Sequence, residues 1–244
     1  MKESKGSFAL RALGYVVALF AVMAGLGELL TRVLNHTAPI SNEDSVNRSL
    51  AAHRTATGNS VTGFFSTLAS TMVIIGLLVV AMIVFRLVYR RWRESVFLLL
   101  AVGTQTLVFL ATAAVIHRAR PKVAHLDAAP PTSSFPSGHT GAATALFVGI
   151  ALVVGWHAGH AWLRAILVVL ALAVPIAVAY SRLYRGMHHP SDVAAGLLDG
   201  ILAVTIWARQ VLYGHLPRSW AERLDGHRDV TSSRTLEGSA GVHA

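Results

Sequence analysis

The 244-residue sequence contains no cysteine, and only 14% of its residues are charged. Without cysteine the chain has no disulfide bonds, no thiolate ligands for zinc and no cysteine nucleophile. The charged fraction is well below the roughly 25% of an average soluble domain, whereas 54% of the residues are hydrophobic. This composition excludes an ordinary water-soluble fold and intrinsic disorder, and it indicates a protein of the lipid bilayer.

Six apolar runs are long enough to cross a bilayer. A spanning helix needs about 20 mostly apolar residues to cross about 30 Å of hydrocarbon. The runs cover approximately residues 12–31, 64–85, 95–116, 140–156, 161–180 and 193–212. They predict an all-α membrane protein, a bundle of six transmembrane helices formed by residues 1–213.

Lysine and arginine are distributed unevenly between the two sides of this predicted bundle. With the N-terminus inside, 13 of the 21 basic residues fall on the cytoplasmic side and eight on the external side. Since positively charged loops tend to remain cytoplasmic, the excess predicts a multi-pass cell-membrane protein with both termini in the cytoplasm. The net charge of +9 is then suited to anionic lipid, and we expect no nucleic-acid partner.

Two further polar segments lie outside the predicted spans. Residues 41–52 predict a short amphipathic helix along the membrane surface, with Glu43 or Asp44 in its first turn. Residues 214–244 are rich in Arg, Ser, Gly and His and have no apolar periodicity. We expect this segment to be a disordered cytoplasmic tail.

The chemistry-bearing residues fall into two clusters, at 117–139 and 181–192, separated by the fourth and fifth spans. Because an even number of spans separates them, both clusters lie on the same external face. Together they supply guanidinium groups, which donate paired hydrogen bonds to phosphate, and imidazoles, which transfer protons near neutral pH. A Ser-Gly turn before the fourth span adds backbone amides at a helix N-terminus. The sequence therefore predicts a site for phosphate chemistry at the external membrane interface.

The spacing within these clusters resembles that of the type 2 phosphatidic acid phosphatase superfamily. Ser181-Arg182, His188 and Asp192 resemble its third signature, Pro-Ser-Gly-His at 136–139 resembles the second, and Arg120-Pro121 resembles the end of the first, all within 113–192. The resemblance implies an integral membrane lipid phosphatase of the bacterial polyprenyl-diphosphate or phosphatidylglycerophosphate type. The soluble vanadium-dependent haloperoxidases of that superfamily have a similar anion pocket, but the hydropathy of this chain argues against them.

The resemblance also implies a role for each matching residue. His188 would be the nucleophile and form a phosphohistidine, Asp192 would hydrogen-bond its far ring nitrogen, and His139 would act as general acid and base. The phosphate oxygens would be bound by Arg120, Ser137, Gly138 and Arg182. This scheme requires no metal and no cofactor.

One position departs from the family pattern. The first signature usually begins with a lysine seven residues before Arg120, where this chain has Ala113. We expect Arg118, at the end of the third span, to bind phosphate in its place. The alternative is a non-catalytic lipid-binding or transport protein with a degenerate phosphate site.

The implied substrate is a membrane lipid phosphate in the surrounding bilayer. An external site favours polyprenyl (undecaprenyl or decaprenyl) diphosphate, with phosphatidylglycerophosphate or phosphatidic acid as alternatives; the oligomeric state stays open. Among the remaining polar residues, we expect His189 to act as a helix cap or to support the catalytic residues, and Asp199 to support them or to pair between helices.

Overall fold

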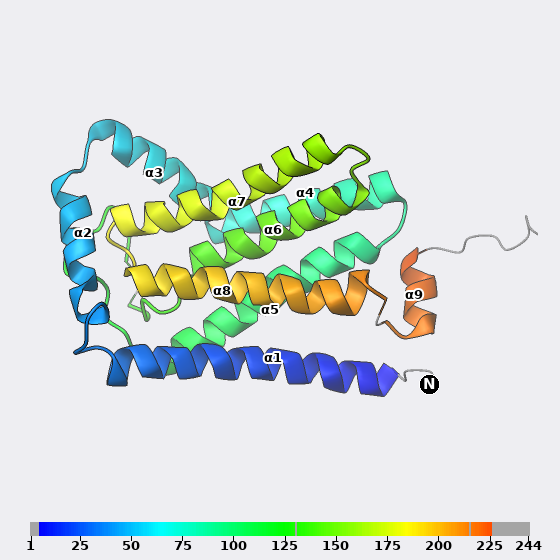
Figure 1. Ribbon diagram of the computed structural model, residues 1–244, viewed down its shortest axis with the longest axis horizontal. Coiled ribbons are helices and arrows are strands. Elements are labelled where there is room, and N and C mark those ends of the chain that lie inside the picture. The colour runs from blue at the N-terminus through cyan, green and yellow to red at the C-terminus, as the bar shows by residue number, and fades with distance from the viewer. Residues whose placement is uncertain (1–4, 130, 215, 226–244) are drawn as a thin grey trace, which may run out of the picture.

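The computed structural model describes residues 5–129, 131–214 and 216–225, and within these residues every regular element is a helix. Six helices are long and apolar enough to cross a membrane, as the sequence predicts, and the chain is a multi-pass membrane protein. They lie side by side in Figure 1. The six spanning helices are α1 (Lys5–Glu28), α4 (Thr71–Tyr89), α5 (Arg93–Val115), α6 (Gly138–His157), α7 (Ala161–Tyr184) and α8 (Pro190–Trp207). Wider π-helical turns, Leu29–Val33 and Ala208–Leu212, extend α1 and α8.

The second predicted span begins later than the sequence suggests. The apolar stretch after Arg54 forms two helices, α3 (Ala56–Leu68) and α4, separated at Ala69 and Ser70. Thr55 caps α3 through a 3.0 Å hydrogen bond from the Gly58 amide. The buried residues of α3, Thr62 and Ser66, are polar because they face polar groups of α7 rather than lipid.

The helix predicted at residues 41–52 is present as α2 (Glu43–Ala52), preceded by a short turn at Ile40–Asn42. In Figure 1 it runs across the left end of the bundle, at a steep angle to the spans. Its buried residues are Glu43 and Asn47. α2 therefore packs with polar side chains on the ends of the spanning helices.

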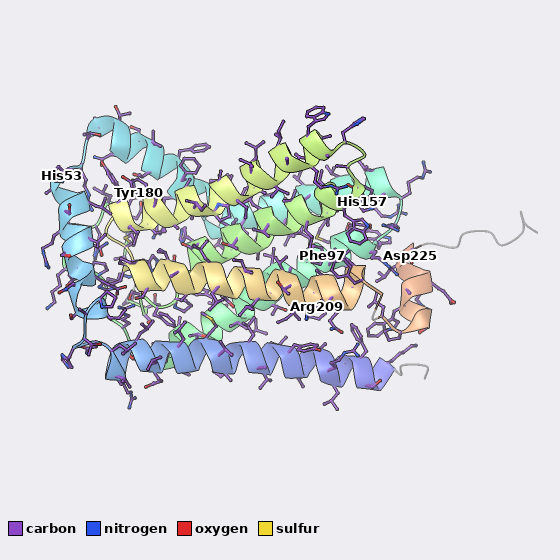
Figure 2. The ribbon with its side chains drawn as sticks, viewed as in Figure 1. His53, Phe97, His157, Tyr180, Arg209 and Asp225 are labelled. Carbon is purple, nitrogen blue, oxygen red and sulfur yellow. The ribbon has the colours of Figure 1, made fainter. Side chains whose placement is uncertain are left out.

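The interior of the bundle is centred on α5, α6 and α8. Phe97, Leu98 and Leu146 are fully buried there. α6 and α8 approach closely because small residues face each other: a Cβ at Gly200 would lie 2.7 Å from the Gly141 carbonyl oxygen. Small residues commonly allow such contact between membrane helices. α4 and α7 are more exposed and carry apolar side chains outward (Figure 2).

Part of the predicted disordered tail is helical. α9 (Arg218–Asp225) forms at residues expected to lack structure, while residues 226–244 of that prediction lie outside the described residues. Its Trp220 ring packs on Phe8 of α1, with centroids 5.3 Å apart. Arg93 of α5 also pairs with Asp225 at 2.9 Å. These tertiary contacts explain why composition alone failed to predict the helix.

The two ends of the bundle differ in content. The site end, on the left of Figure 1, carries α2, α3, the α5–α6 loop and the α7–α8 turn. The far end, on the right, carries the start of α1, the α4–α5 and α6–α7 connections and α9. Both clusters of chemistry-bearing residues lie at the site end.

Candidate active site

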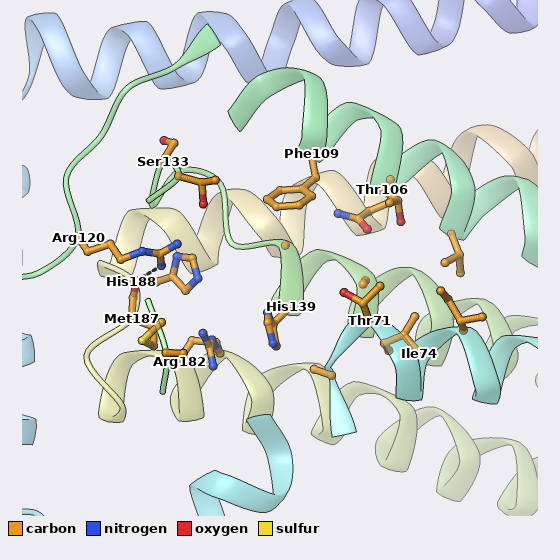
Figure 3. Close-up of a pocket in the computed structure, with 18 residues that line it drawn as sticks. Thr71, Ile74, Thr106, Phe109, Arg120, Ser133, His139, Arg182, Met187 and His188 are labelled. Carbon is orange, nitrogen blue, oxygen red and sulfur yellow. Dashed lines mark hydrogen bonds between the residues drawn. The ribbon is translucent and has the colours of Figure 1, made fainter. Parts of the chain in front are cut away.

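A cavity of about 260 Å³ brings the predicted residues of all three signatures together. Arg120 comes from the α5–α6 loop, Gly138 and His139 from the first turn of α6, Arg182 from the last turn of α7, and His188 from the turn before α8. In Figure 3 the side chains of Arg120, His139, Arg182 and His188 gather around one end of this cavity. The juxtaposition expected from the even number of intervening spans is therefore present in the fold.

The opposite part of the cavity is mostly apolar and extends between α4, α5 and α6. Ile75, whose side chain is 51% exposed, lines it together with the exposed Thr71 and Thr106. The cavity therefore opens between α4 and α5, on the lateral face of the bundle. Its apolar part is lined by Ala69, Ile74, Ile75, Val102, Phe109 and Ala142.

His188 is oriented by a backbone carbonyl rather than by the predicted carboxylate. Its Nδ1 lies 2.7 Å from the carbonyl oxygen of Ser134, whereas the Asp192 carboxylate is 3.9 Å from the same nitrogen. Because a carbonyl can only accept a hydrogen bond, Nδ1 must carry the proton. Nε2 is then left with its lone pair free, as a nucleophile requires.

The burial of His188 favours this neutral form. Only 5% of the residue is exposed. Burial lowers the pKa of His188 to about 3, and the neighbouring charges of Arg182 and Arg120 act in the same direction, while Asp192 and the bond to Ser134 oppose them. His188 is therefore uncharged near neutral pH.

Asp192 has a different role from the one expected. Its carboxylate accepts hydrogen bonds from Arg118 at 2.5 Å and from the His189 amide at 2.8 Å. The bond to His189 forms part of a capping box at the start of α8, which confirms His189 as a helix cap. Asp192 thus stabilises the helix terminus beside His188.

Arg118 does not replace the missing lysine at position 113. Its guanidinium donates to Glu43 at 2.7 Å, to Asp192 at 2.5 Å and to Ser191 at 2.7 Å. Two carboxylates therefore hold Arg118 away from the cavity, whose lining does not include it. The expectation that Arg118 binds phosphate is wrong for this conformation, because Glu43, 75 residues away in sequence, supplies the second carboxylate.

Arg120 and Arg182 are the two arginines that line the cavity. Arg120 donates to the Met187 carbonyl at 2.8 Å, and burial lowers its pKa, opposed by Asp192. Arg182 donates to Ser66 and Asp127, each at 2.6 Å. The Nε atoms of both arginines are buried and have no hydrogen-bond partner in the described structure. Guanidinium groups remain charged at any physiological pH, so the cavity has positive charge at this end.

Asp127, a residue that sequence reasoning missed, binds Arg182 and a second arginine outside the cavity lining, Arg185. Its carboxylate is bound by Arg182 and by Arg185, the latter through bonds of 2.6 and 2.9 Å. Burial alone would raise the pKa of Asp127, but the hydrogen bonds from Arg185 and Ser66 and the charges of both arginines hold it well below its usual range. A lone aspartate in a loop carries no motif, so only the fold reveals this role.

Of the two residues of the Ser-Gly turn that were expected to bind phosphate, Gly138 lines the cavity and Ser137 does not. Gly138 lines the cavity, and a Cβ there would lie 2.7 Å from the Phe109 ring, so this position requires glycine. The Ser137 hydroxyl lies instead 2.9 Å from that of Thr140, outside the lining of the cavity. Ser133 and Thr132 provide hydroxyl groups in the lining.

Several other predicted roles can be compared with the structure. Asp199 accepts a 3.0 Å hydrogen bond from Gln105 of α5, which confirms it as an interhelical partner. Among the described residues, no group of three or more His, Asp or Glu side chains is arranged to hold a metal ion.

Comparison with known proteins identifies related sequences. A sequence model of the PAP2 superfamily matches residues 94–215. Over 78 residues, the chain is 37% identical to YbjG of Escherichia coli K12, named as a proposed undecaprenyl-diphosphatase; the match covers 30% of this chain and 35% of that protein. Over 72 residues, it is 42% identical to the bacitracin transport permease protein BcrC of Bacillus licheniformis, covering 29% and 30%. The chain thus spans about a third of the length of these relatives.

Solved structures share the fold over a larger part of the chain. The phosphatidylglycerolphosphate phosphatase of Bacillus subtilis, a transmembrane protein of the PAP2 type, superposes with a TM-score of 0.71 at 23% identity, covering 83% of this chain and 98% of that one. LpxE of Aquifex aeolicus superposes with a TM-score of 0.55 at 24% identity, covering 68% and 93%. The six-helix arrangement is therefore an established fold of membrane proteins.

Proposed function

Because this chain belongs to the PAP2 superfamily, which includes membrane lipid phosphatases, we propose that it hydrolyses a lipid phosphate or diphosphate through a phosphohistidine at His188. The observation that carries the proposal is the hydrogen bond from His188 Nδ1 to the Ser134 carbonyl. It leaves Nε2 unprotonated at the cationic end of a cavity that opens laterally.

The reaction has two steps. In the first, Nε2 of His188 attacks the terminal phosphorus, the bond from that phosphorus to the leaving oxygen of the lipid (the bridging oxygen in a diphosphate) breaks, and protonated His139 gives that oxygen its proton. In the second, His139 takes a proton from water, the water oxygen attacks phosphorus, and the P–N bond breaks to release inorganic phosphate. Arg120 and Arg182, with the Gly138 amide, stabilise the charge that develops on the phosphoryl oxygens.

The shape of the cavity supports a lipid substrate. The cationic end suits the phosphate, and the apolar part between α4 and α5 suits the tail, which can remain in the bilayer. The excess of basic residues at the far end favours cytoplasmic termini and an external site. We therefore assign polyprenyl diphosphate as the preferred substrate, by similarity to YbjG of E. coli, which is named as a proposed undecaprenyl-diphosphatase. The products would be polyprenyl phosphate and inorganic phosphate.

Two alternatives have specific support. The fold shared with the phosphatidylglycerolphosphate phosphatase of B. subtilis favours a glycerophospholipid substrate. The name of the B. licheniformis relative favours a transport function without hydrolysis. In that second case Ala113 would mark the loss of a phosphate ligand.

The test is phosphate release by the purified full-length protein in detergent, with EDTA present, from polyprenyl diphosphate, phosphatidylglycerophosphate and phosphatidic acid. We expect release from polyprenyl diphosphate at the highest rate, none by His188→Ala, and a ³²P label on the wild-type protein in an acid-labile, base-stable bond. Faster release from a phospholipid would overturn the substrate assignment. Release that persists in His188→Ala, or no release from any of the three, would overturn the proposed chemistry.

A further inference from the structure

Two buried residues of α2 contact the backbone on either side of the proposed nucleophile. Glu43 and Asn47 are one helical turn apart, so they lie on the same face of α2, and they are 6% and 0% exposed. α2 precedes residues 94–215, which match the superfamily, so the comparisons assign these two residues no role. Figure 1 shows α2 lying across the site end of the bundle, beside the α7–α8 turn.

Asn47 holds the turn that carries His188. Its side-chain amide donates to the carbonyl oxygen of His188 at 3.0 Å and to that of Leu183 at 3.2 Å. These two carbonyls bracket the tight turn between α7 and α8, where Gly186 has a positive φ of 75°. The Asn47 Oδ1 atom is buried and has no partner, so the side chain acts through its two donors. His188 is thereby held at both its carbonyl oxygen and its ring.

Glu43 holds the first turn of α8. It accepts from the Ser191 amide at 2.7 Å and from the Ser191 hydroxyl at 2.8 Å. The amides of a first helical turn lack partners within the helix, and a carboxylate is favourable at that positive end. Glu43 also accepts from Arg118, which in turn binds Asp192. One carboxylate of α2 thus joins the start of α8 to the beginning of the α5–α6 loop.

We propose that α2 is a clamp in which Glu43 and Asn47 are positioning residues for phosphohistidine formation. They fix the backbone of residues 183–191 and so aim Nε2 of His188 at phosphorus. The inference rests on the proposed function for its chemistry. A displacement of about 1 Å in a reacting group can cost roughly 100-fold in rate, so a clamp of this kind acts on the attack step itself.

Two variants of matched size alter the clamp: the first removes the hydrogen bonds of residue 47, and the second removes the charge of residue 43. Asn47→Leu retains the shape of the side chain and lacks both donors, and Glu43→Gln retains the shape and lacks the charge. Arg48→Gln, on the exposed side of the same helix, is the control for a change in α2 that leaves these contacts intact. All are made in the full-length protein.

The decisive measurement is rapid-quench kinetics with ³²P-labelled lipid diphosphate. For Asn47→Leu we expect the rate constant of phosphohistidine formation to fall about 10- to 100-fold, with an unchanged rate of its hydrolysis and an unchanged amplitude per folded protein. For Glu43→Gln we expect a smaller fall, and for Arg48→Gln none. A reduced amplitude with an unchanged rate constant would overturn the proposal, because it would show that α2 supports folding only.

Hydrogen exchange tests the clamp without reference to activity. Backbone amides of residues 183–191 should exchange faster in Asn47→Leu than in the wild type and in Arg48→Gln, while amides of α5 stay unchanged. Equal exchange in that segment would overturn the clamp. If the wild type released no phosphate from any lipid, the proposed function would fail, and the exchange measurement would still decide whether α2 fixes the turn.

Discussion

At the far end of the bundle Arg91 binds Glu94 through a 2.9 Å hydrogen bond, and His157 of α6 lies 3.5 Å from the same carboxylate. At the site end Asp127 is bound by Arg182 and Arg185. Both carboxylates are bound by arginine side chains, yet their surroundings differ. Glu94 is 1% exposed and lies where packed helices meet. Arg182, the partner of Asp127, also lines the cavity. Figure 2 labels His157 near the far end.

The two ends show that arginine–carboxylate pairs can have different roles, depending on what surrounds the arginine. At the far end the pair joins the start of α5 to the end of α6, where the His157 ring also packs on Tyr89 with centroids 4.1 Å apart. At the site end the carboxylate fixes an arginine whose Nε remains without a partner. A fixed guanidinium with donors to spare can bind an anion with little reorganisation. The far-end pair is thus structural, and the site-end pair prepares a phosphate site.

The largest expected difference is between variants in which a histidine at one end or at the other is replaced by alanine. His188→Ala should reduce phosphate release about 10⁴-fold or more, because it removes the nucleophile. His157→Ala should leave kcat of the folded protein within about twofold of wild type, because its ring is remote from the cavity lining. Phosphate-release assays on both purified variants check this. A similar loss in both would refute the separation between the two ends.

Removal of an arginine at each end should have the next largest effect. Arg120→Gln should lower kcat/KM about 10²- to 10³-fold, because it removes a cation from the phosphoryl oxygens. Arg91→Gln should lower the Tm instead, because it leaves Glu94 buried with one cation fewer. Steady-state kinetics and thermal unfolding of the same preparations separate the two outcomes. A lower kcat/KM in Arg91→Gln at an unchanged Tm would contradict the assignment.

The pair at Asp127 makes stability depend on pH. Its pKa is lower in the folded protein than the roughly 3.9 of an unfolded aspartate. The stability that this pair contributes is therefore present above about pH 4 and is lost as the pH falls through the folded pKa. The Tm of Asp127→Asn should accordingly be lower than that of wild type at pH 6, with the difference shrinking below about pH 4. A difference that does not change between these pH values would show that the charge of Asp127 contributes nothing.

The smallest expected effect concerns α9. The Arg93–Asp225 pair is partly exposed, with side chains 16% and 30% accessible, and such pairs contribute about 0–1 kcal/mol. Arg93→Gln should therefore shift the Tm by at most a few degrees and leave phosphate release unchanged, since Trp220 still packs on Phe8. Thermal unfolding measures the shift. A large loss of stability would show that α9 supports the bundle more than its contacts indicate.

The parts of the fold that sequence reasoning predicted are those set by the thickness of the bilayer. Six spans follow from run length alone, and the two spans between residues 117–139 and 181–192 place both clusters at one end. The break at Ala69 was missed because hydropathy does not register a change of helix direction. α9 was missed because Trp220 is stabilised by distant Phe8 rather than by neighbours in sequence.

Within the candidate site, the side chains of the motifs were predicted and their partners were not. His139, Arg120, Arg182 and His188 meet as the spacing implies. The acceptor for His188 is a main-chain oxygen, which no pattern of side chains can reveal. The pairing of Arg118 with Glu43 depends on how α2 folds back over the site. The motifs at 113–192 cannot predict it, because Glu43 lies outside them.

The main-chain acceptor for His188 also affects which substitutions the protein can tolerate during evolution. Every amino acid at position 134 would present a carbonyl oxygen, so substitution of the Ser134 side chain leaves this hydrogen bond chemically available. A substitution at position 134 therefore does not remove the acceptor that keeps the proton on Nδ1 of His188. Asp192 caps the terminus of α8 and does not decide which ring nitrogen of His188 carries the proton, although its charge still raises the pKa of the imidazole.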